Sequence, residues 1–361
     1  MKFKNMCRKF GALALVSAMC VASLAGCGSS SDLSDASSSS SDSSGSSDSS
    51  SDESGSGDYT IDVVFKTTSN EYTKYLMAGC QAAADDLGVS IDMKGATSET
   101  AYDEQQNMIE TDLASGKYDA LIVAPLQGDL VATLIQNVDI PVFAIDTDFD
   151  SDKKVALIGC GQQDAAKMGA EAAYEAAKEA GWDEVNLVCL AGVQGDSTAE
   201  ARKNGYQEGV EESGGTFLED EVQYTDAVAD KAVNCMEAIM QNHPEGVAIV
   251  ACHNDDCAIA AARAAKDNEA FKNTIFLGFD GISSACQSIL DGEETMTIAQ
   301  NPYDQGYAAI ETAVKKLKGE EVDSFINTQA EIVTKENAQE NLEKMNAYLE
   351  GLDTTDADSA S

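Results

Sequence analysis

The sequence predicts an α/β protein with two domains, each a doubly wound parallel sheet covered by helices. Short apolar runs alternate with longer amphipathic stretches over most of the 361 residues. The short runs are continuously apolar, as is typical of parallel strands that helices cover on both faces. About ten such runs are more than one compact sheet usually holds, so two sheets are expected.

The expected elements follow this alternation in chain order. The predicted strands are residues 61–65, 89–93, 120–124, 140–145, 155–158, 185–190, 216–218, 247–251, 274–278 and 295–299. The clearest helices, in which apolar residues recur at helical spacing, are residues 164–180, 198–213, 229–241 and 303–318.

Residues 1–26 are predicted to be a signal peptide. Four basic residues precede an apolar run, residues 10–24, that is too short to span a bilayer comfortably. The stretch Leu24-Ala25-Gly26-Cys27 resembles a bacterial lipobox, in which the cysteine is acylated, with palmitate among the usual chains, and begins the mature protein. An ordinary signal peptide with a chance cysteine is the alternative. We expect an extracytoplasmic lipoprotein anchored at Cys27 to the outer face of the cell membrane.

Residues 27–58 are almost entirely Ser, Asp and Gly. Such a segment cannot bury enough apolar surface to offset its ordering entropy, so it is predicted to be a flexible acidic tether. The folded part therefore starts near residue 59.

The charge excludes one class of partner. The chain carries 23 Lys and Arg against 63 Asp and Glu, a formal net charge of -40. Because a phosphate backbone would be repelled, nucleic acid is not an expected ligand.

Seven cysteines lie in the expected folded part. They sit singly in apolar segments, where a free thiol behaves as a small hydrophobic side chain, and we favour buried free thiols over the alternative of a disulfide framework. Their spacing does not suggest zinc. They are Cys80, Cys160, Cys189, Cys235, Cys252, Cys257 and Cys286.

Polar residues follow several of the predicted strands. In open parallel sheets, ligands bind at the carboxyl ends of the strands. Asp280 lies in Gly278-Phe279-Asp280-Gly281, where a carboxylate can accept hydrogen bonds from two neighbouring hydroxyls. Asn254 and Gln300 follow two further strands. Each of these residues could instead serve a turn or a helix cap, and Asp255 is expected to be a cap.

Five segments together carry a family resemblance, and they occur in order over residues 59–330. The chain resembles the ribose/galactose-type periplasmic sugar-binding proteins. The segments are Ser69-Asn70-Glu71-Tyr72, the strand ending at Asp146, Asn254-Asp255, Gly278-Phe279-Asp280-Gly281 and Thr297-Ile298-Ala299-Gln300.

The resemblance implies a two-lobed clamp of the type I periplasmic-binding-protein kind, with a three-stranded hinge crossed near residues 160, 300 and 328. It implies an N-terminal lobe of residues 59–160 and 301–327, and a C-terminal lobe of residues 161–300 and 328–335. A C-terminal helix and acidic tail, residues 336–361, follow. The residues that it implies as hydrogen-bonding ligands are Asn70, Asp146, Asn254, Asp280 and Gln300, with Tyr72 as a stacking aromatic.

The chain departs from the ribose-binding pattern at two positions. Thr147 and Glu200 stand where those relatives carry arginines, and Arg202 matches only the second arginine of its segment. Without these two arginine side chains, the cleft has fewer hydrogen-bond donors to offer the acceptor groups of a ligand. With the carboxylates of Asp146, Asp148, Glu200 and Asp280 expected to converge, we take all of these residues as candidate ligand contacts, and an amine-bearing solute such as an amino sugar becomes a hypothesis.

Other chemistries have weaker support. Gly159-Cys160-Gly161 opens a helix, but Asp164 stands where a dinucleotide fingerprint needs its third glycine. Residues 146–151 resemble the start of a calcium loop, but the glycine and the glutamate that such a loop requires are Ser151 and Leu157. With two histidines in the chain and no nucleophile elbow, we expect neither an enzyme nor a metal site or cofactor.

The resemblance implies a monomeric solute-binding protein that delivers a sugar or sugar-like solute to the membrane subunits of an ABC-type importer. The alternative is a ligand sensor that presents its closed form to a membrane receptor or kinase. The two would share the same clamp.

Overall fold

A computed structural model describes residues 59–349 of the chain. The expected signal peptide, Cys27, the tether and the acidic end of the chain lie outside the described residues. Within residues 59–349, two sheets form, and none of the described helices is long and apolar enough to cross a membrane.

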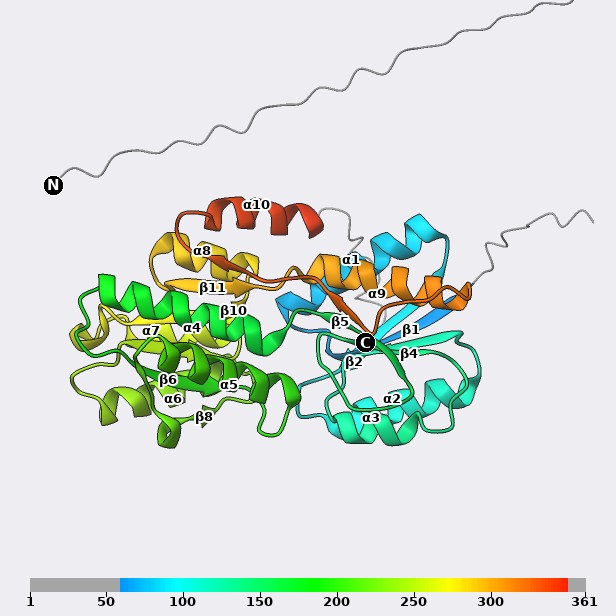
Figure 1. Ribbon diagram of the computed structural model, residues 1–361, viewed down its shortest axis with the longest axis horizontal. Coiled ribbons are helices and arrows are strands. Elements are labelled where there is room, and N and C mark those ends of the chain that lie inside the picture. The colour runs from blue at the N-terminus through cyan, green and yellow to red at the C-terminus, as the bar shows by residue number, and fades with distance from the viewer. Residues whose placement is uncertain (1–58, 350–361) are drawn as a thin grey trace, which may run out of the picture. The chain divides into compact units, whose positions relative to one another are not determined.

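The first sheet is the core of what we call the N-terminal lobe (Figure 1). Its strand order is β12-β5-β4-β3-β1-β2, and the pairs are parallel. Its strands are β1 (Thr60–Thr67), β2 (Ser90–Ala96), β3 (Ala120–Val123), β4 (Val142–Ile145), β5 (Lys154–Gly159) and β12 (Phe325–Asn327).

Helices cover both faces of this sheet, which explains the continuous apolar run in β1. Val63 packs in the cluster that includes α1 and α9, whereas its neighbour Val64 packs in the cluster that includes α2 and α3. The helices are α1 (Glu71–Leu87), α2 (Tyr102–Ser115), α3 (Gly128–Leu134) and α9 (Pro302–Leu317).

The second sheet is the core of the C-terminal lobe. Its order is β13-β11-β10-β9-β6-β7, with β8 also paired to β6, and β13 runs antiparallel to β11. Its strands are β6 (Asn186–Ala191), β7 (Thr216–Phe217), β8 (Gln223–Tyr224), β9 (Ile249–Cys252), β10 (Ile275–Asp280), β11 (Met296–Ala299) and β13 (Glu331–Val333).

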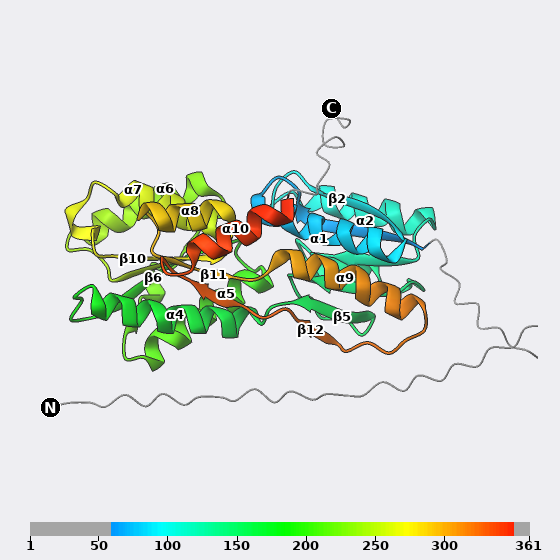
Figure 2. The same ribbon diagram turned by 90° about the horizontal axis from the view of Figure 1, so that it is seen from above.

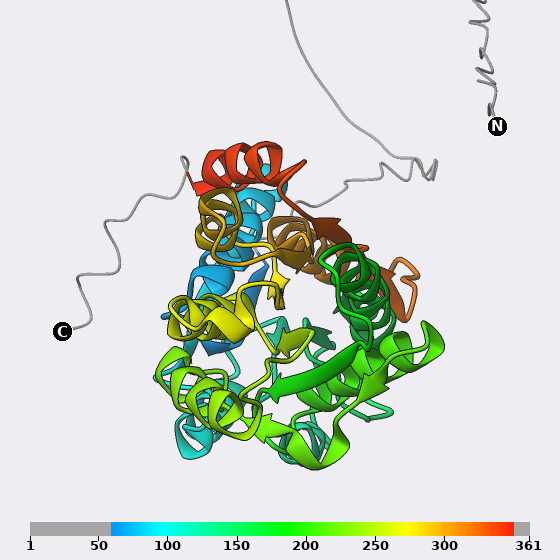
Figure 3. The ribbon, with the colours of Figure 1, turned by 90° about the vertical axis from the view of Figure 1, so that its left-hand side faces the viewer.

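Helices also cover both faces of the second sheet. In Figure 3, the green helices α4 and α5 lie on one side of the strands and the yellow-green to yellow helices α6 and α7 on the other, in agreement with two separate apolar clusters. Helix α10 packs against α8 and α1 (Figure 2). These helices are α4 (Gln162–Glu179), α5 (Ser197–Glu212), α6 (Ala229–Asn242), α7 (Asp255–Ala265), α8 (Ser283–Asp291) and α10 (Ala338–Leu349).

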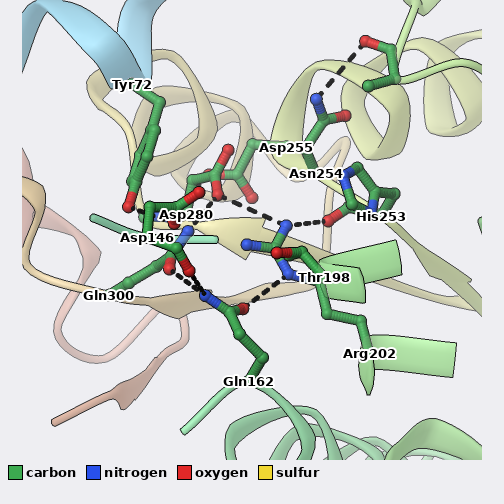
Figure 4. A network of polar contacts seen from close by, with 12 residues as sticks. Tyr72, Asp146, Gln162, Thr198, Arg202, His253, Asn254, Asp255, Asp280 and Gln300 are labelled. Atoms are coloured by element: carbon green, nitrogen blue, oxygen red, sulfur yellow. Dashed lines mark hydrogen bonds and ion pairs between the residues drawn. The ribbon is translucent and has the colours of Figure 1, made fainter. Parts of the chain in front are cut away.

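The chain passes from one sheet to the other at three places. They lie between β5 and α4, between β11 and α9, and between β12 and β13. The predicted α/β class with two parallel-sheet lobes is confirmed. Asp146 follows β4 and Asp280 ends β10, in different sheets, and both aspartates lie in the same polar network (Figure 4).

The ten predicted strands are all present, with ends shifted by a few residues. Three further strands, β8, β12 and β13, were not predicted, because they are two or three residues long and partly exposed at sheet margins, with no continuous apolar run. The seven cysteines of the described residues are free thiols, six of them buried. Burial raises the pKa of the thiol in each of them.

Candidate sugar-binding site

A polar cluster gathers where the strand ends of the two lobes approach each other (Figure 4). Asp146 directly follows β4, Asp280 ends β10, and Gln300 directly follows β11. The Tyr72 hydroxyl, from the first turn of α1, donates to Asp146 Oδ1 at 2.9 Å. Gln300 Nε2 donates to Asp280 Oδ1 at 2.6 Å. The cluster therefore contains side chains from both lobes.

Arg202 of α5 joins the cluster from the C-terminal lobe. Its Nε donates to Gln162 Oε1 at 2.9 Å and its Nη1 donates to the His253 carbonyl at 2.6 Å. The guanidinium lies 3.7 Å from the centroid of the Phe279 ring, and Nη1 is 3.8 Å from Asp280 Oδ1. Stacking and hydrogen bonds thus fix a buried cation beside a buried carboxylate.

Gln162 connects the two halves of the cluster. Its Nε2 donates to Gln300 Oε1 at 3.2 Å and to the Asp146 carbonyl at 3.3 Å. Gln162 begins α4, just after the chain first passes from one sheet to the other. Its hydrogen bonds therefore connect the cluster to the segment that joins the two lobes.

The backbone at the two aspartates is strained. Asp146 has φ 62° and Asp280 has φ 128°, in the region that favours glycine. Such residues cost of order 1–3 kcal/mol each and collect at functional sites. The strain aims both carboxylates at the cluster and is consistent with a binding role.

Burial shapes the electrostatics of the cluster. Asp280 is 7% exposed, and burial raises the pKa of its carboxyl well above the usual range although Arg202 opposes this. The pKa of the Tyr72 phenol is also raised, by burial and then by the charge of Asp146. The phenol therefore stays protonated and donates its hydrogen bond.

An ion pair that the sequence did not predict joins the lobes. Lys66 Nζ, near the end of β1, donates to Asp196 Oδ2 at 2.6 Å, and Asp196 is also the N-cap of α5. Burial opposes both charges, but each partner outweighs it: the pKa of Lys66 is raised and the pKa of Asp196 is lowered. The pair is therefore ionised.

Hydroxyl contacts add to this connection on both sides of the cluster. Thr198 Oγ1 donates to Thr147 Oγ1 at 3.0 Å, and Thr147 Oγ1 donates to Asp146 Oδ2 at 3.1 Å. On the α1 side, Ser284 Oγ donates to Glu71 Oε2 at 2.7 Å. Side-chain hydrogen bonds thus connect the two lobes at two further places.

Two cavities lie between segments of the two lobes, one lined in part by Thr147 and the other in part by Thr198. One of about 500 Å³ is lined by loops such as residues 125–130 of the N-terminal lobe and 193–197 of the C-terminal lobe. The other, of about 380 Å³, is lined by residues that include Asp146, Gln162 and Thr198. Asp148 lines both.

Six of the predicted contacts join the cluster through hydrogen bonds or ion pairs, and four make their polar contacts to groups outside it. Those in the cluster are Tyr72, Asp146, Thr147, Arg202, Asp280 and Gln300. Asn70 and Asn254 cap α1 and α7 by accepting from Thr73 N and Cys257 N. Asp148 pairs with Lys154, and Glu200 pairs with Lys203 at 2.6 Å.

Two expectations need correction. The four predicted carboxylates do not all join the cluster: Asp146 and Asp280 do, whereas Asp148 and Glu200 pair with nearby lysines, although Asp148 lines the same cavity as Asp146. Asp255 is not the cap of α7, a position that Asn254 occupies. Its buried carboxylate instead accepts from the amides of Gly281 and Ile282.

Lys66 and Gln162 are the main residues that the sequence analysis missed. A lysine at the end of the apolar run Val63-Val64-Phe65 is unusual enough to have pointed to a buried partner. Gln162 lies in residues 159–163, which follow a predicted strand as the other candidates do, but its side chain is not among the predicted contacts.

Two parallel-sheet lobes with polar side chains gathered at the carboxyl ends of their strands define the class of two-lobed solute-binding proteins. A family model of the periplasmic binding protein domain matches residues 61–321. The chain belongs to this family, and within it to the ribose/galactose type of periplasmic sugar-binding proteins.

Named relatives agree with this assignment. The chain is 29% identical over 280 residues to the ribose import binding protein of Escherichia coli, an alignment that covers 77% of this chain and 91% of the relative. It is 28% identical over 267 residues to the D-allose-binding periplasmic protein of the same species, covering 72% and 85% of the two chains.

A solved structure agrees in fold. It is a carbohydrate transporter solute-binding protein from Agrobacterium radiobacter in complex with D-arabinose, which matches with a TM-score of 0.73 at 25% identity, over 81% of this chain and 99% of that one.

Proposed function

We propose that this protein captures a sugar or sugar-like solute between its lobes and delivers it to an ABC-type importer. The observation that carries the proposal is the cluster of Tyr72, Asp146, Arg202, Asp280 and Gln300, which draws on both lobes and holds charged donors and acceptors side by side. The names of the relatives, which bind ribose, allose and arabinose, support the solute class.

The chemistry of the cluster suits a polyhydroxylated ring. Asp146 and Asp280 accept from hydroxyl groups, whereas Arg202 and the Gln300 amide donate to them. A hydrogen bond to a charged group contributes about 1.5 to 3 kcal/mol. A few such bonds are enough for micromolar affinity, which corresponds to about -8 kcal/mol.

Capture requires that the lobes move. We propose that residues 59–160 with 301–327 form one moving lobe, that residues 161–300 with 328–335 form the other, and that the crossings near 160, 300 and 328 are the hinge. The Lys66–Asp196 pair then forms only when the lobes close. The closed form would present a composite surface that the importer recognises.

Membrane attachment completes the proposal. We infer that the protein is exported, that Cys27 is acylated and that residues 27–58 tether the folded lobes to the outer face of the membrane. Labelling cells with a palmitate analogue tests this inference: the wild-type protein should take up label and fractionate with membranes. Cys27→Ser should do neither, and labelling of that variant would contradict the assignment.

Calorimetric titration of residues 59–361 with ribose, allose, arabinose and matched amino sugars tests the solute class. We expect micromolar binding of at least one neutral sugar. With Asp148 and Glu200 outside the cluster, Arg202 offsets one of the two remaining carboxylates, so the hypothesis of an amine-bearing solute depends on preferential binding of an amino sugar.

The delivery step needs its own test. The sugar-loaded protein should stimulate the ATPase activity of the importer membrane complex encoded beside it. Binding without such stimulation, combined with activation of a membrane kinase, would favour a ligand sensor instead.

A further inference from the structure

A buried glutamate outside the sugar cluster has no obvious partner. Glu294 lies in the loop between α8 and β11 and is 2% exposed. Neither of its carboxyl oxygens has a hydrogen-bond partner among the described residues. A buried ionised carboxylate without partners would be very costly, so the group needs another explanation.

A second buried carboxyl group lies beside it. Asp255 Oδ1 and Glu294 Oε1 are each 2.2 Å from the point where a β-carbon on Gly278 would sit, so the two oxygens are no more than twice that distance apart. This explains the glycine, because any side chain there would collide with both acids. The two carboxyl groups therefore form a pair, which we call the acid pair.

The two members of the acid pair have different surroundings. Asp255 accepts from Gly281 N at 2.8 Å, from Ile282 N at 3.0 Å and from Thr297 Oγ1 at 2.5 Å. These donors favour an ionised Asp255, whereas Glu294 has no donor in the described part of the chain. Two adjacent buried anions are unfavourable, so the pair retains a proton on Glu294.

We propose that the acid pair of Asp255 and Glu294 holds one shared proton at neutral pH and positions Asp280 for ligand binding. The part that concerns ligand rests on the proposed sugar-binding function. Asp255 holds the amides of the two residues that follow Asp280, and Asp280 itself has a strained backbone. Loss of the shared proton would place two repelling charges directly behind this turn.

The charged groups around the pair come from several elements. Asp256 lies on α7, Asp280 on β10, and Glu71 of α1 acts on Asp256. Arg202 of α5 lies beside Asp280. The thiols Cys252 and Cys286 also face the pair and stay neutral, because burial raises the pKa of both. The charges that act on Glu294 are thus acidic.

The direction of the pH effect follows from these surroundings. Burial, and then Asp255, raises the pKa of Glu294 well above its ordinary value of 4.5, and burial raises the pKa of Asp255 to about 7. As pH rises, the two carboxyl groups lose their protons in the unfolded chain before they lose them in the folded protein. The pair therefore lowers the free energy of unfolding more and more as pH rises from the pKa values of the unfolded chain through those of the folded protein. Below pH 4 this cost disappears.

Thermal unfolding of wild type and Glu294→Gln between about pH 4.5 and 8.5 tests the acid pair without any ligand. We expect similar melting temperatures at the acid end and a variant that melts at least about 3 °C higher at the alkaline end. The matched control is Glu293→Gln: burial scarcely affects this neighbour, and Arg263 and Lys266 lower its pKa, so its loss should not stabilise the protein at any pH.

Infrared spectroscopy provides a direct measurement of the proton. Other buried carboxyl groups with a raised pKa, such as Asp280 and Asp62, contribute to the protonated-acid band in both proteins, so the measurement is a difference spectrum. At pH 7, wild type minus Glu294→Gln should show the carbonyl band of a protonated carboxylic acid. A constant difference in melting temperature across the pH range, or a difference spectrum without this band, would overturn the shared proton. If Glu294→Gln fails to fold, Glu294→Leu replaces it in both measurements.

Sugar binding measured against pH tests the positioning role. Wild-type affinity should fall at least about threefold from pH 6 to pH 9, and affinity of Glu294→Gln should stay level. An equal fall in both proteins would refute the role in positioning. If neither protein binds any sugar while the melting temperatures behave as expected, the proposed function fails and the acid pair stands.

Discussion

Two lysine-centred charge clusters lie at opposite ends of β1 and differ in what holds them together. Lys94 of β2 lies 3.0 Å from Asp62, near the start of β1, and also contacts Asp92 and Asp112 of the same lobe. Lys66, near the end of β1, contacts Asp196 of the other lobe. The first cluster is complete within one lobe, whereas the second exists only when two lobes meet.

The pKa values show the same contrast. Burial raises the pKa of Asp62 to about 7 although Lys94 opposes it, whereas Lys66 outweighs burial and lowers the pKa of Asp196. A buried charge satisfied within a lobe contributes to folding of that lobe. A buried charge satisfied only across lobes contributes to the closed conformation, which is the state a binding protein must regulate.

Replacing Lys94 should have the largest effect on folding. Lys94→Met leaves the buried Asp62 without its cation. Because the pKa of Asp62 is already about 7, this carboxyl takes up a proton near neutral pH in the variant, so the cost rises with pH and reaches about 3 kcal/mol only on the alkaline side. Urea unfolding should show this loss, with sugar affinity of the folded fraction unchanged. Lys117→Met is the control, because Lys117 is mostly exposed beside the same Asp92 and should change stability by less than about 0.5 kcal/mol.

Removal of Asp280 should have the largest effect on binding. Asp280→Ala should weaken sugar affinity by about 1.5 to 3 kcal/mol in calorimetry, with the fold intact, because the cluster loses the carboxyl acceptor beside Arg202. Glu208→Ala serves as the control, since this carboxylate pairs with Lys167 within the C-terminal lobe and lines neither interlobe cavity. Equal losses in the two variants would show that the cluster is not the binding site.

Replacing Lys66 should act on closure and much less on folding. In an open protein Asp196 can return to water, so Lys66→Met should leave urea stability nearly unchanged. It should weaken sugar affinity roughly tenfold, since closure becomes less favourable, and it should increase the radius of gyration in X-ray scattering without sugar. Lys167→Met, which breaks ion pairs within the C-terminal lobe, should change neither the sugar affinity nor the radius of gyration.

The pH response separates this pair from the acid pair. The lowered pKa of Asp196 means that its contribution to closure is present above its ordinary value of 3.8 and is lost as pH falls through the folded pKa. The raised pKa of Lys66 means that its contribution to closure is present below pH 10.5 and is lost as pH rises through the folded pKa. The effect of Lys66→Met should therefore be the same at about pH 5 and pH 9, in contrast to Glu294→Gln.

The sequence predicted the fold well because the fold depends on pattern. Both faces of each sheet are covered, so runs such as Val247–Ala251 are apolar throughout, and alternation with helices indicates parallel strands. The residues at the ends of those strands could be found for the same reason. Asp280 and Gln300 are candidates from their positions after predicted strands, and the family resemblance adds Asp146.

Side-chain pairing across the fold could not be predicted in this way. Asp148 and Glu200 looked equivalent to Asp146 in the sequence, and only the three-dimensional positions of Lys154 and Lys203 show that they are satisfied elsewhere. Lys66 and Asp196 lie 130 residues apart, and Glu294 lies 39 residues from Asp255. No local pattern reports such partners.

The helix caps offer the smallest and most specific test of the contrast between folding and binding. Asn254 caps α7 through a 3.0 Å hydrogen bond to Cys257 N, and its removal in Asn254→Ala should cost about 1 kcal/mol of stability in urea. Asn254→Ser keeps a capping oxygen and should restore most of that loss. If Asn254 also contacts sugar, as the family resemblance implies, both variants should lose affinity although only one loses stability. Unchanged affinity in both would assign Asn254 to folding alone, with the cluster around Asp280 as the binding site.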